Sequence, residues 1–156
     1  MLTLPWTITD PSPDGACTVI AGRLPLRAYR DLTAVVAWVR RTRRHLAIAP
    51  GLAGHTAGVD LSGPALWIVS AWTNRADLVQ FERSDQHQAA KSVLRPRMRP
   101  ATFAVWSCET VDLPVTWTEV RQRIDAASQN AWPSARGYRR FHRREGVARK
   151  AKVNPT

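Results

Sequence analysis

Residues 66–94 read LWIVSAWTNRADLVQFERSDQHQAAKSVL and contain a strand followed by helical sequence. The run ALWIVSAW (65–72) is apolar and rich in β-branched and aromatic residues, which predicts a buried strand. The polar residues after it allow a helix from 75 to about 83. Ser84 offers a second helix cap, so a further helical segment is expected from 85 to about 94.

His87 lies on the apolar stripe of that last segment. Ala90 and Leu94 follow it at spacings of three and seven residues, which puts all three side chains on one helix face. Because this stripe must face the sheet, His87 is expected to point inward. Two interpretations stay open: a buried histidine hydrogen-bonded to backbone or carboxylate, or a pocket residue that acts as acid, base or metal ligand near neutral pH.

The remaining sequence supplies the other elements of an α+β domain. Trp38, on the first helix, is expected in the core. The order is β-α-β-β-α-β with an extra C-terminal helix, which predicts a ferredoxin-like fold with an antiparallel sheet. The patterns predict strands at 17–24, 54–60 and 102–110, a helix from 27 or 29 to 45, and a final helix from about 118 to 127.

Charge and composition divide the 156 residues into three parts: an irregular N-terminal arm (1–15), the ferredoxin-like domain (16–128) and a basic C-terminal extension (129–156). Residues 134–156 carry eight basic residues and one acid, a net charge of 8 − 1 = +7 out of +11. The extension is interpreted as a solvated tail, as an arm over a partner subunit through its aromatic residues, or as a contact for phosphates or acidic partners. Nucleic-acid binding is not expected as the main function, because the rest of the chain is only mildly basic.

Several function classes are disfavoured by the sequence. No apolar run approaches the roughly 18 residues of a membrane helix, and the N-terminus lacks a secretory signal, so a cytoplasmic protein without a membrane span is expected. Cys17 and Cys108 are expected to be free, buried thiols. Nucleotide-binding, hydrolase and metalloprotease motifs are missing, and acids are too few for a carboxylate-rich metal site, so no metal is predicted.

Three stretches resemble one superfamily. APGLAG (49–54) resembles the turn between its first helix and second strand, and IVSAWTNRADLVQFERSDQHQAA (68–90) resembles its strand ending in Trp and the helix with Phe, Ser and His. TFAVWSCETVDLP (102–114) resembles its last strand and exit. The chain is thus similar, over about residues 16–125, to the dimeric α/β-barrel superfamily, in particular to antibiotic-biosynthesis-monooxygenase-like and spheroidene-monooxygenase-like proteins.

The resemblance implies a pocket between the helices and the sheet. There His87 is the candidate catalytic residue, and Trp72, Trp106, Arg23 and His55 are candidate substrate-binding residues. The tryptophans could form an aromatic wall for a flat ligand, or simply fill the core or a dimer interface. Arg23 and His55 could bind the substrate or lie at a strand edge.

Fold alone does not decide the function, because the superfamily includes cofactor-free oxygenases, haem enzymes, isomerases and proteins without known activity. The first hypothesis is a small monooxygenase-like enzyme, or a proton-transfer isomerase or cyclase. It would act on an apolar aromatic, polyketide-like or isoprenoid substrate and require no cofactor. The alternatives are a non-catalytic dimeric ligand-binding or structural protein, and a haem-dependent enzyme with His87 as axial ligand.

The predicted sheet leads to a first testable expectation. Helices on one face only would leave an apolar face in water, and a second copy of the same sheet is the usual cover, so we expect a homodimer. Light scattering at micromolar concentration measures the mass in solution. A monomer would contradict the expectation, unless the N-terminal arm or the tail covers the sheet.

Overall fold

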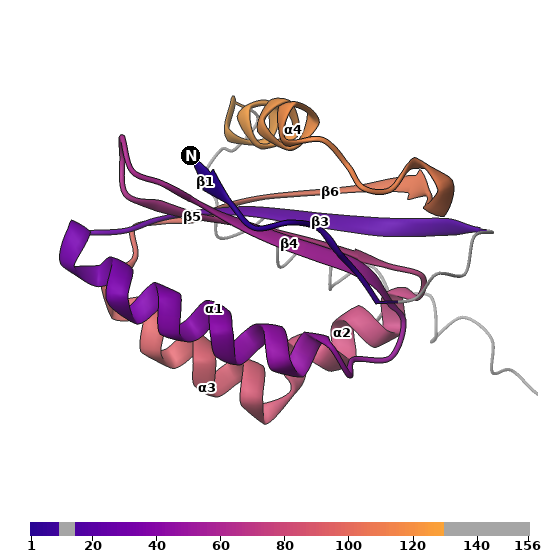
Figure 1. Cartoon of the computed structure of the whole chain (residues 1–156), viewed down its shortest axis with the longest axis horizontal. Coiled ribbons are helices and arrows are strands. Elements are labelled where there is room, and N and C mark those ends of the chain that lie inside the picture. Colours follow the sequence, from indigo (N-terminus) through magenta and orange to yellow (C-terminus); the bar gives the residue numbers. More distant parts are fainter. Residues whose placement is uncertain (10–14, 130–156) are drawn as a thin grey trace, which may run out of the picture.

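A computed structural model describes residues 1–9 and 15–129 and shows one antiparallel sheet between two helical layers (Figure 1). Its four long strands are β3 (Ala16–Pro25), β4 (Leu52–Asp60), β5 (Ala65–Trp72) and β6 (Thr102–Glu109). They lie in the order β4-β5-β3-β6, and every neighbouring pair is antiparallel. The predicted α+β, ferredoxin-like fold is therefore confirmed.

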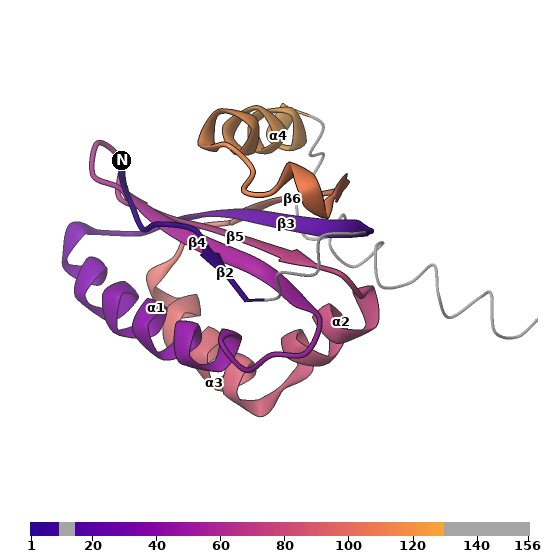
Figure 2. The ribbon, with the colours of Figure 1, turned by 45° about the vertical axis from the view of Figure 1, so that its right-hand side comes forward.

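Three helices cover one face of this sheet (Figures 1 and 2): α1 (Leu32–Leu46), α2 (Arg75–Arg83) and α3 (Asp85–Leu94). A 3-10 turn, η1 (Tyr29–Asp31), precedes α1, so the α-helix begins a little later than predicted. The side chains of Asn74 and Ser84 accept hydrogen bonds from the first turns of α2 and α3. The cap expected at Ser84 is therefore present, and Asn74, one of the polar residues after β5, caps α2.

The two faces of the sheet carry different side chains, as the alternation predicts. On β5, Leu66 packs with Val35 and Trp38 of α1 on the helix-covered face. Trp67 and Val69 belong to a second core on the opposite face. The alternation along β5 therefore separates two apolar cores, one on each side of the sheet.

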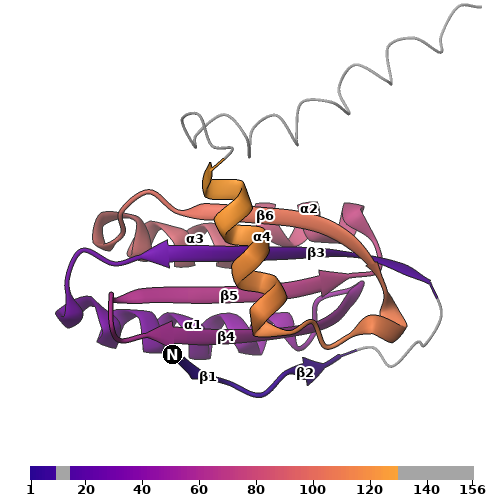
Figure 3. The ribbon, with the colours of Figure 1, turned by 90° about the horizontal axis from the view of Figure 1, so that it is seen from above.

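The second core is covered by the C-terminal helix α4 (Trp117–Gln129). Its Val120 and Ile124 side chains are each only 1% exposed. Seen from above, α4 crosses the strands on the face opposite α1–α3 (Figure 3). The sequence predicted this helix but not its position. The open face from which we inferred a homodimer is thus partly covered within one chain, and the homodimer stays a prediction.

The N-terminal arm is more regular than expected. Two short strands, β1 (Leu2–Thr3) and β2 (Thr7–Ile8), pair antiparallel with β4. Between them the Leu4 amide donates to the Ala57 carbonyl at 2.8 Å, and the Thr56 hydroxyl donates to the Leu4 carbonyl at 2.8 Å. In residues 1–9 the interpretation as an irregular arm is therefore wrong, because the free edge of β4 offers backbone partners.

Cys17 and Cys108 are free thiols on facing strands, with their sulfur atoms 2.8 Å apart. Cys17 is buried and Cys108 is half-buried, and burial raises the pKa of the Cys108 thiol to about 12. No helix in the described residues is long and apolar enough to cross a membrane. The basic extension, with Trp132, Tyr138 and Phe141, lies outside the described residues beyond position 129.

We predict that Ile124→Ala lowers the free energy of unfolding by about 2–4 kcal/mol, because it removes a fully buried side chain between α4 and the sheet. Denaturant unfolding of the full chain measures this change. The control is Gln122→Ala on the exposed side of the same helix, which should change stability by less than about 0.5 kcal/mol. Equal effects of the two substitutions would mean that α4 does not pack on the sheet.

Candidate functional site

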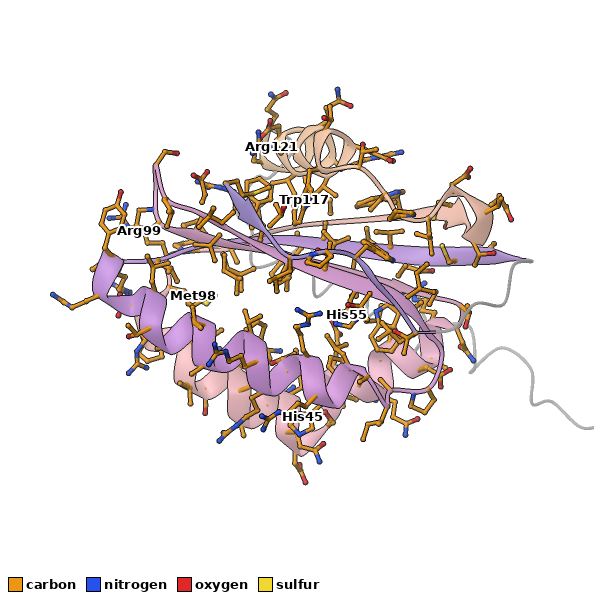
Figure 4. The ribbon with its side chains drawn as sticks, viewed as in Figure 1. His45, His55, Met98, Arg99, Trp117 and Arg121 are labelled. Carbon is orange, nitrogen blue, oxygen red and sulfur yellow. The ribbon has the colours of Figure 1, made fainter. Side chains whose placement is uncertain are left out.

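A cavity of about 330 Å³ lies between the sheet and helices α1–α3. This volume is within the range of roughly 300–1,000 Å³ typical of small-molecule sites. Figure 4 shows His55 in the space between the strands and α1. Apolar side chains form most of the wall, among them Ile20, Leu24, Val39, Leu46, Ile68, Leu78, Leu94, Met98 and Phe103.

His87 lines this cavity from the first turn of α3, with Ala90 and Leu94 buried behind it on the same stripe. The break between α2 and α3 fixes its position. The Ser84 hydroxyl accepts from the His87 amide at 3.3 Å and donates to the Phe81 carbonyl at 2.7 Å. The Phe81 and His87 rings consequently lie side by side, with centroids 5.0 Å apart.

The His87 imidazole is neutral at pH 7. Burial, with a smaller contribution from the Lys91 ammonium, lowers its pKa from 6.5 to about 4. Its Nδ1 atom is buried and has no hydrogen-bond partner among the described residues. A neutral imidazole in an apolar cavity can accept a proton from a ligand or bind it by a hydrogen bond.

His55 lines the same cavity from the opposite side, on β4. The pairing of β4 with β5 shifts by one residue between Leu52 and Gly54. Because strand side chains alternate, this bulge turns His55 to the helix-covered face, where it pairs with Ser70. Burial, aided by the Arg43 guanidinium, lowers the pKa of His55 to about 4, and neither ring nitrogen has a partner among the described residues.

Trp72 lies at the end of β5 and also lines the cavity. Its ring centroid is 5.3 Å from that of Phe81, so an aromatic wall runs from Trp72 through Phe81 to His87. The indole N–H donates to the Ser70 hydroxyl at 3.0 Å. Trp72 is only 1% exposed, so its ring supports Phe81 from behind, and its N–H is already satisfied.

Arg23 and Trp106 lie on the other face of the sheet, under α4. Trp106 belongs to the core beneath that helix, and the Arg123 guanidinium lies 5.4 Å from the centre of its ring. The Arg23 guanidinium is 5.8 Å from the centre of the Trp67 ring, on the same face. The structure thus brings together three of the five candidate residues, His87, His55 and Trp72, and separates the other two from them.

Two cavity residues on α1 were missed from the sequence. Trp38 was expected in the core, and Thr42 was not considered. Both line the cavity at 8% exposure, one helical turn apart, and neither Trp38 Nε1 nor Thr42 Oγ1 has a hydrogen-bond partner among the described residues. The available signal was a threonine four residues after a tryptophan on an apolar helix stripe.

Charged residues at the cavity are mostly basic. Arg43, Lys91 and Arg95 contribute to its wall, and Glu82 is the single acid among its described lining residues. The described part of the chain contains no group of three or more His, Cys, Asp or Glu side chains placed to hold a metal ion. The arrangement can therefore bind an apolar molecule with an anionic or proton-donating group.

Comparison with known proteins supports the fold. No family model and no curated protein matches the sequence. Among solved structures, a putative monooxygenase from Lactobacillus acidophilus aligns at 7% identity with a TM-score of 0.57, over 67% of this chain and 49% of that chain. This chain therefore spans about half the length of that protein.

Two shorter proteins align over nearly their whole length. A dimeric ferredoxin-like protein of unknown function from Thermobifida fusca has 12% identity and a TM-score of 0.55, over 64% of this chain and 98% of that chain. SnoaB from Streptomyces nogalater is described as a cofactor-independent oxygenase. It has 13% identity and a TM-score of 0.52, over 65% of this chain and 96% of that chain. Other neighbours are putative antibiotic biosynthesis monooxygenases, so the predicted resemblance is confirmed at the level of fold.

We predict that the two cavity histidines destabilise the protein in acid. Their pKa values are lower in the folded chain than the usual 6.5, so the unfolded chain binds more protons between about pH 6.5 and pH 4. The free energy of unfolding is therefore unaffected by these histidines above pH 6.5, and it falls as the pH decreases towards 4. Melting temperatures between pH 7.5 and 4.5 measure this fall.

The double variant His55→Gln, His87→Gln should lose less stability over the same pH range than the wild type. His45→Gln, outside the cavity lining, controls for the loss of a histidine. An equally steep fall in the double variant and the wild type would mean that other groups cause the acid sensitivity.

Proposed function

We propose that this protein is a small oxygenase that acts on an apolar, conjugated substrate in the cavity between sheet and helices. The observation that carries the proposal is the pair of buried, neutral imidazoles of His87 and His55 in one apolar cavity. The monooxygenase-like fold neighbours, including a cofactor-independent oxygenase, support the same general kind of activity.

The proposed reaction begins with proton transfer from an acidic C–H of the substrate to His87. The resulting imidazolium and carbanion stabilise each other, since an ion pair interacts strongly where water is excluded. The carbanion then supplies the electrons that reduce O2, so no bound cofactor is needed. For a substrate with a reactive CH2 group, one O2 converts CH2 to C=O and releases one water, and the substrate provides all the electrons.

The aromatic wall and the second histidine have separate roles in this proposal. Phe81, supported by the buried Trp72 ring 5.3 Å away, would lie against the flat part of the substrate. His55, on the other side of the cavity, would bind a polar end of the substrate. Arg23 and Trp106 lie on the α4 face, and we do not include them in the substrate-binding set.

A proton-transfer isomerase or cyclase would use the same first step without O2. A ligand-binding protein without catalysis is the alternative from another class, and the open cavity supports ligand binding in either case. The haem alternative, with His87 as axial ligand, is less well supported. A cavity of about 330 Å³ is near the lower end of the usual range for ligand sites and suits two or three fused rings better than a tetrapyrrole. Addition of haem to the purified protein should then leave the Soret band of free haem neither shifted nor sharpened.

The test is oxygen uptake with anthrone, a three-ring aromatic ketone with an acidic CH2 group. We expect conversion to anthraquinone with one O2 consumed per molecule. His87→Phe should reduce the rate about a hundredfold or more, as expected for the loss of a general base. Because phenylalanine preserves apolar bulk, the melting temperature should change by only a few degrees.

His45→Phe is the matched control, because His45 is on α1 but does not line the cavity. Full activity in a stable His87→Phe protein would eliminate the catalytic role of His87. Turnover of a substrate without oxygen uptake would favour the isomerase alternative. Binding of anthrone without turnover would favour a ligand-binding protein.

A further inference from the structure

Helix α1 and strand β4, which both border the cavity, contain buried polar atoms that have no hydrogen-bond partner among the described residues. They are Trp38 Nε1 and Thr42 Oγ1 on α1, and Nδ1 and Nε2 of His55 on β4. The three side chains are 8%, 8% and 4% exposed. A buried polar group without a hydrogen bond costs about 1–3 kcal/mol. Arg43 of α1 bonds to Thr7, and Thr7 pairs with His55, so α1 and β4 meet at one side of the cavity. A polar group of a ligand is suited to that side.

These side chains favour a ligand group whose oxygen atoms accept hydrogen bonds. An indole N–H can only donate, and the threonine hydroxyl and a neutral imidazole can each donate one hydrogen. Arg43, which follows Thr42 and lines the same cavity, adds a positive charge. Its Nη2 donates to the neutral Thr7 hydroxyl at 2.9 Å, and no carboxylate of the described residues forms an ion pair with it.

The charge balance of the whole cavity points the same way. Arg43, Lys91 and Arg95 contribute to the wall, against the single acid Glu82 among the described lining residues. An amine ligand would meet a surplus of positive charge, whereas an anion would be attracted. One guanidinium with neutral donors beside it matches the two oxygen atoms of a carboxylate.

We propose that Trp38, Thr42, Arg43 and His55 bind the carboxylate of an apolar carboxylic acid. The hydrocarbon part of the acid then occupies the apolar remainder of the cavity, along Ile68 and Leu94. This inference rests on the proposed use of the cavity as a substrate site and adds the substrate class. It also separates the two histidines, because His55 recognises the acid while His87 faces the carbon skeleton.

The experiment measures the binding of three probes with the same alkyl chain to the full-length protein at pH 7.5. Isothermal titration calorimetry with decanoate, 1-decanol and decylamine, all below their aggregation limits, compares an acid, an alcohol and an amine. We expect decanoate to bind about tenfold or more tightly than decanol, as expected for charge-assisted hydrogen bonds, and decylamine to bind most weakly.

Three substitutions test the named residues. Arg43→Gln, Thr42→Val and Trp38→Phe each remove a donor or the charge and largely retain side-chain size. Each should weaken decanoate binding severalfold to tenfold and weaken decanol binding less, because a neutral hydroxyl accepts weaker hydrogen bonds than a carboxylate. Arg44→Gln, the exposed neighbour on the same helix, is the control for Arg43. Thr7→Val separates the role of Arg43 in the cavity from its bond to Thr7.

Equal affinities for decanoate and decanol would overturn the inference, as would equal effects of Arg43→Gln and Arg44→Gln. Failure of all three probes to bind would overturn it too, whatever the anthrone assay shows. Anthrone has no carboxylate, so the two proposals can fail separately. A decanoate preference without any oxygen uptake would support acid binding and refute the oxygenase.

Discussion

The structure depends on one constraint: the central strands β3 and β5 are apolar on both faces, so both faces must be covered. Val19 and Ala71, on neighbouring strands, have no exposed surface on the α4 side, while Leu66 is 1% exposed on the side of α1 and α3. A conventional ferredoxin-like unit supplies helices for one face. Here the additional helix α4 covers the other face with Val120 and Ile124. One face of the sheet therefore forms a packed core, and the other borders the cavity.

The helix-covered face is the one that can hold a ligand. Its cavity depends on two local irregularities. The break at Ser84 separates α2 from α3 and sets Phe81 beside His87. The bulge near Ala53 turns His55 inward from β4. An uninterrupted helix would not place Phe81 beside His87, and a regular strand would turn His55 to the other face of the sheet. The candidate site therefore depends on these two interruptions of secondary structure.

The sequence predicted the order of elements and the inward direction of His87, because periodicity reports local geometry directly. It did not identify Trp38 and Thr42 as cavity residues, since an apolar helix stripe looks the same beside a packed core and beside a cavity. Arg23 and Trp106 were grouped with His87 because alternation tells which residues share a face, not which face the helices cover. The face of His55 could not be predicted either, as a single extra residue in β4 reverses it.

Pairing at the two edges of the sheet has a consequence for self-association. The outer edge of β4 is occupied by β1 and β2, which have two residues each and are interrupted by Pro5. Short strands and proline are poor templates for a further strand. Among the described residues, β6 is then the long strand with an unpaired edge. A sheet continued through that edge would pair two β6 strands and place the short strands β1 and β2 at its outer edges, where further pairing is disfavoured.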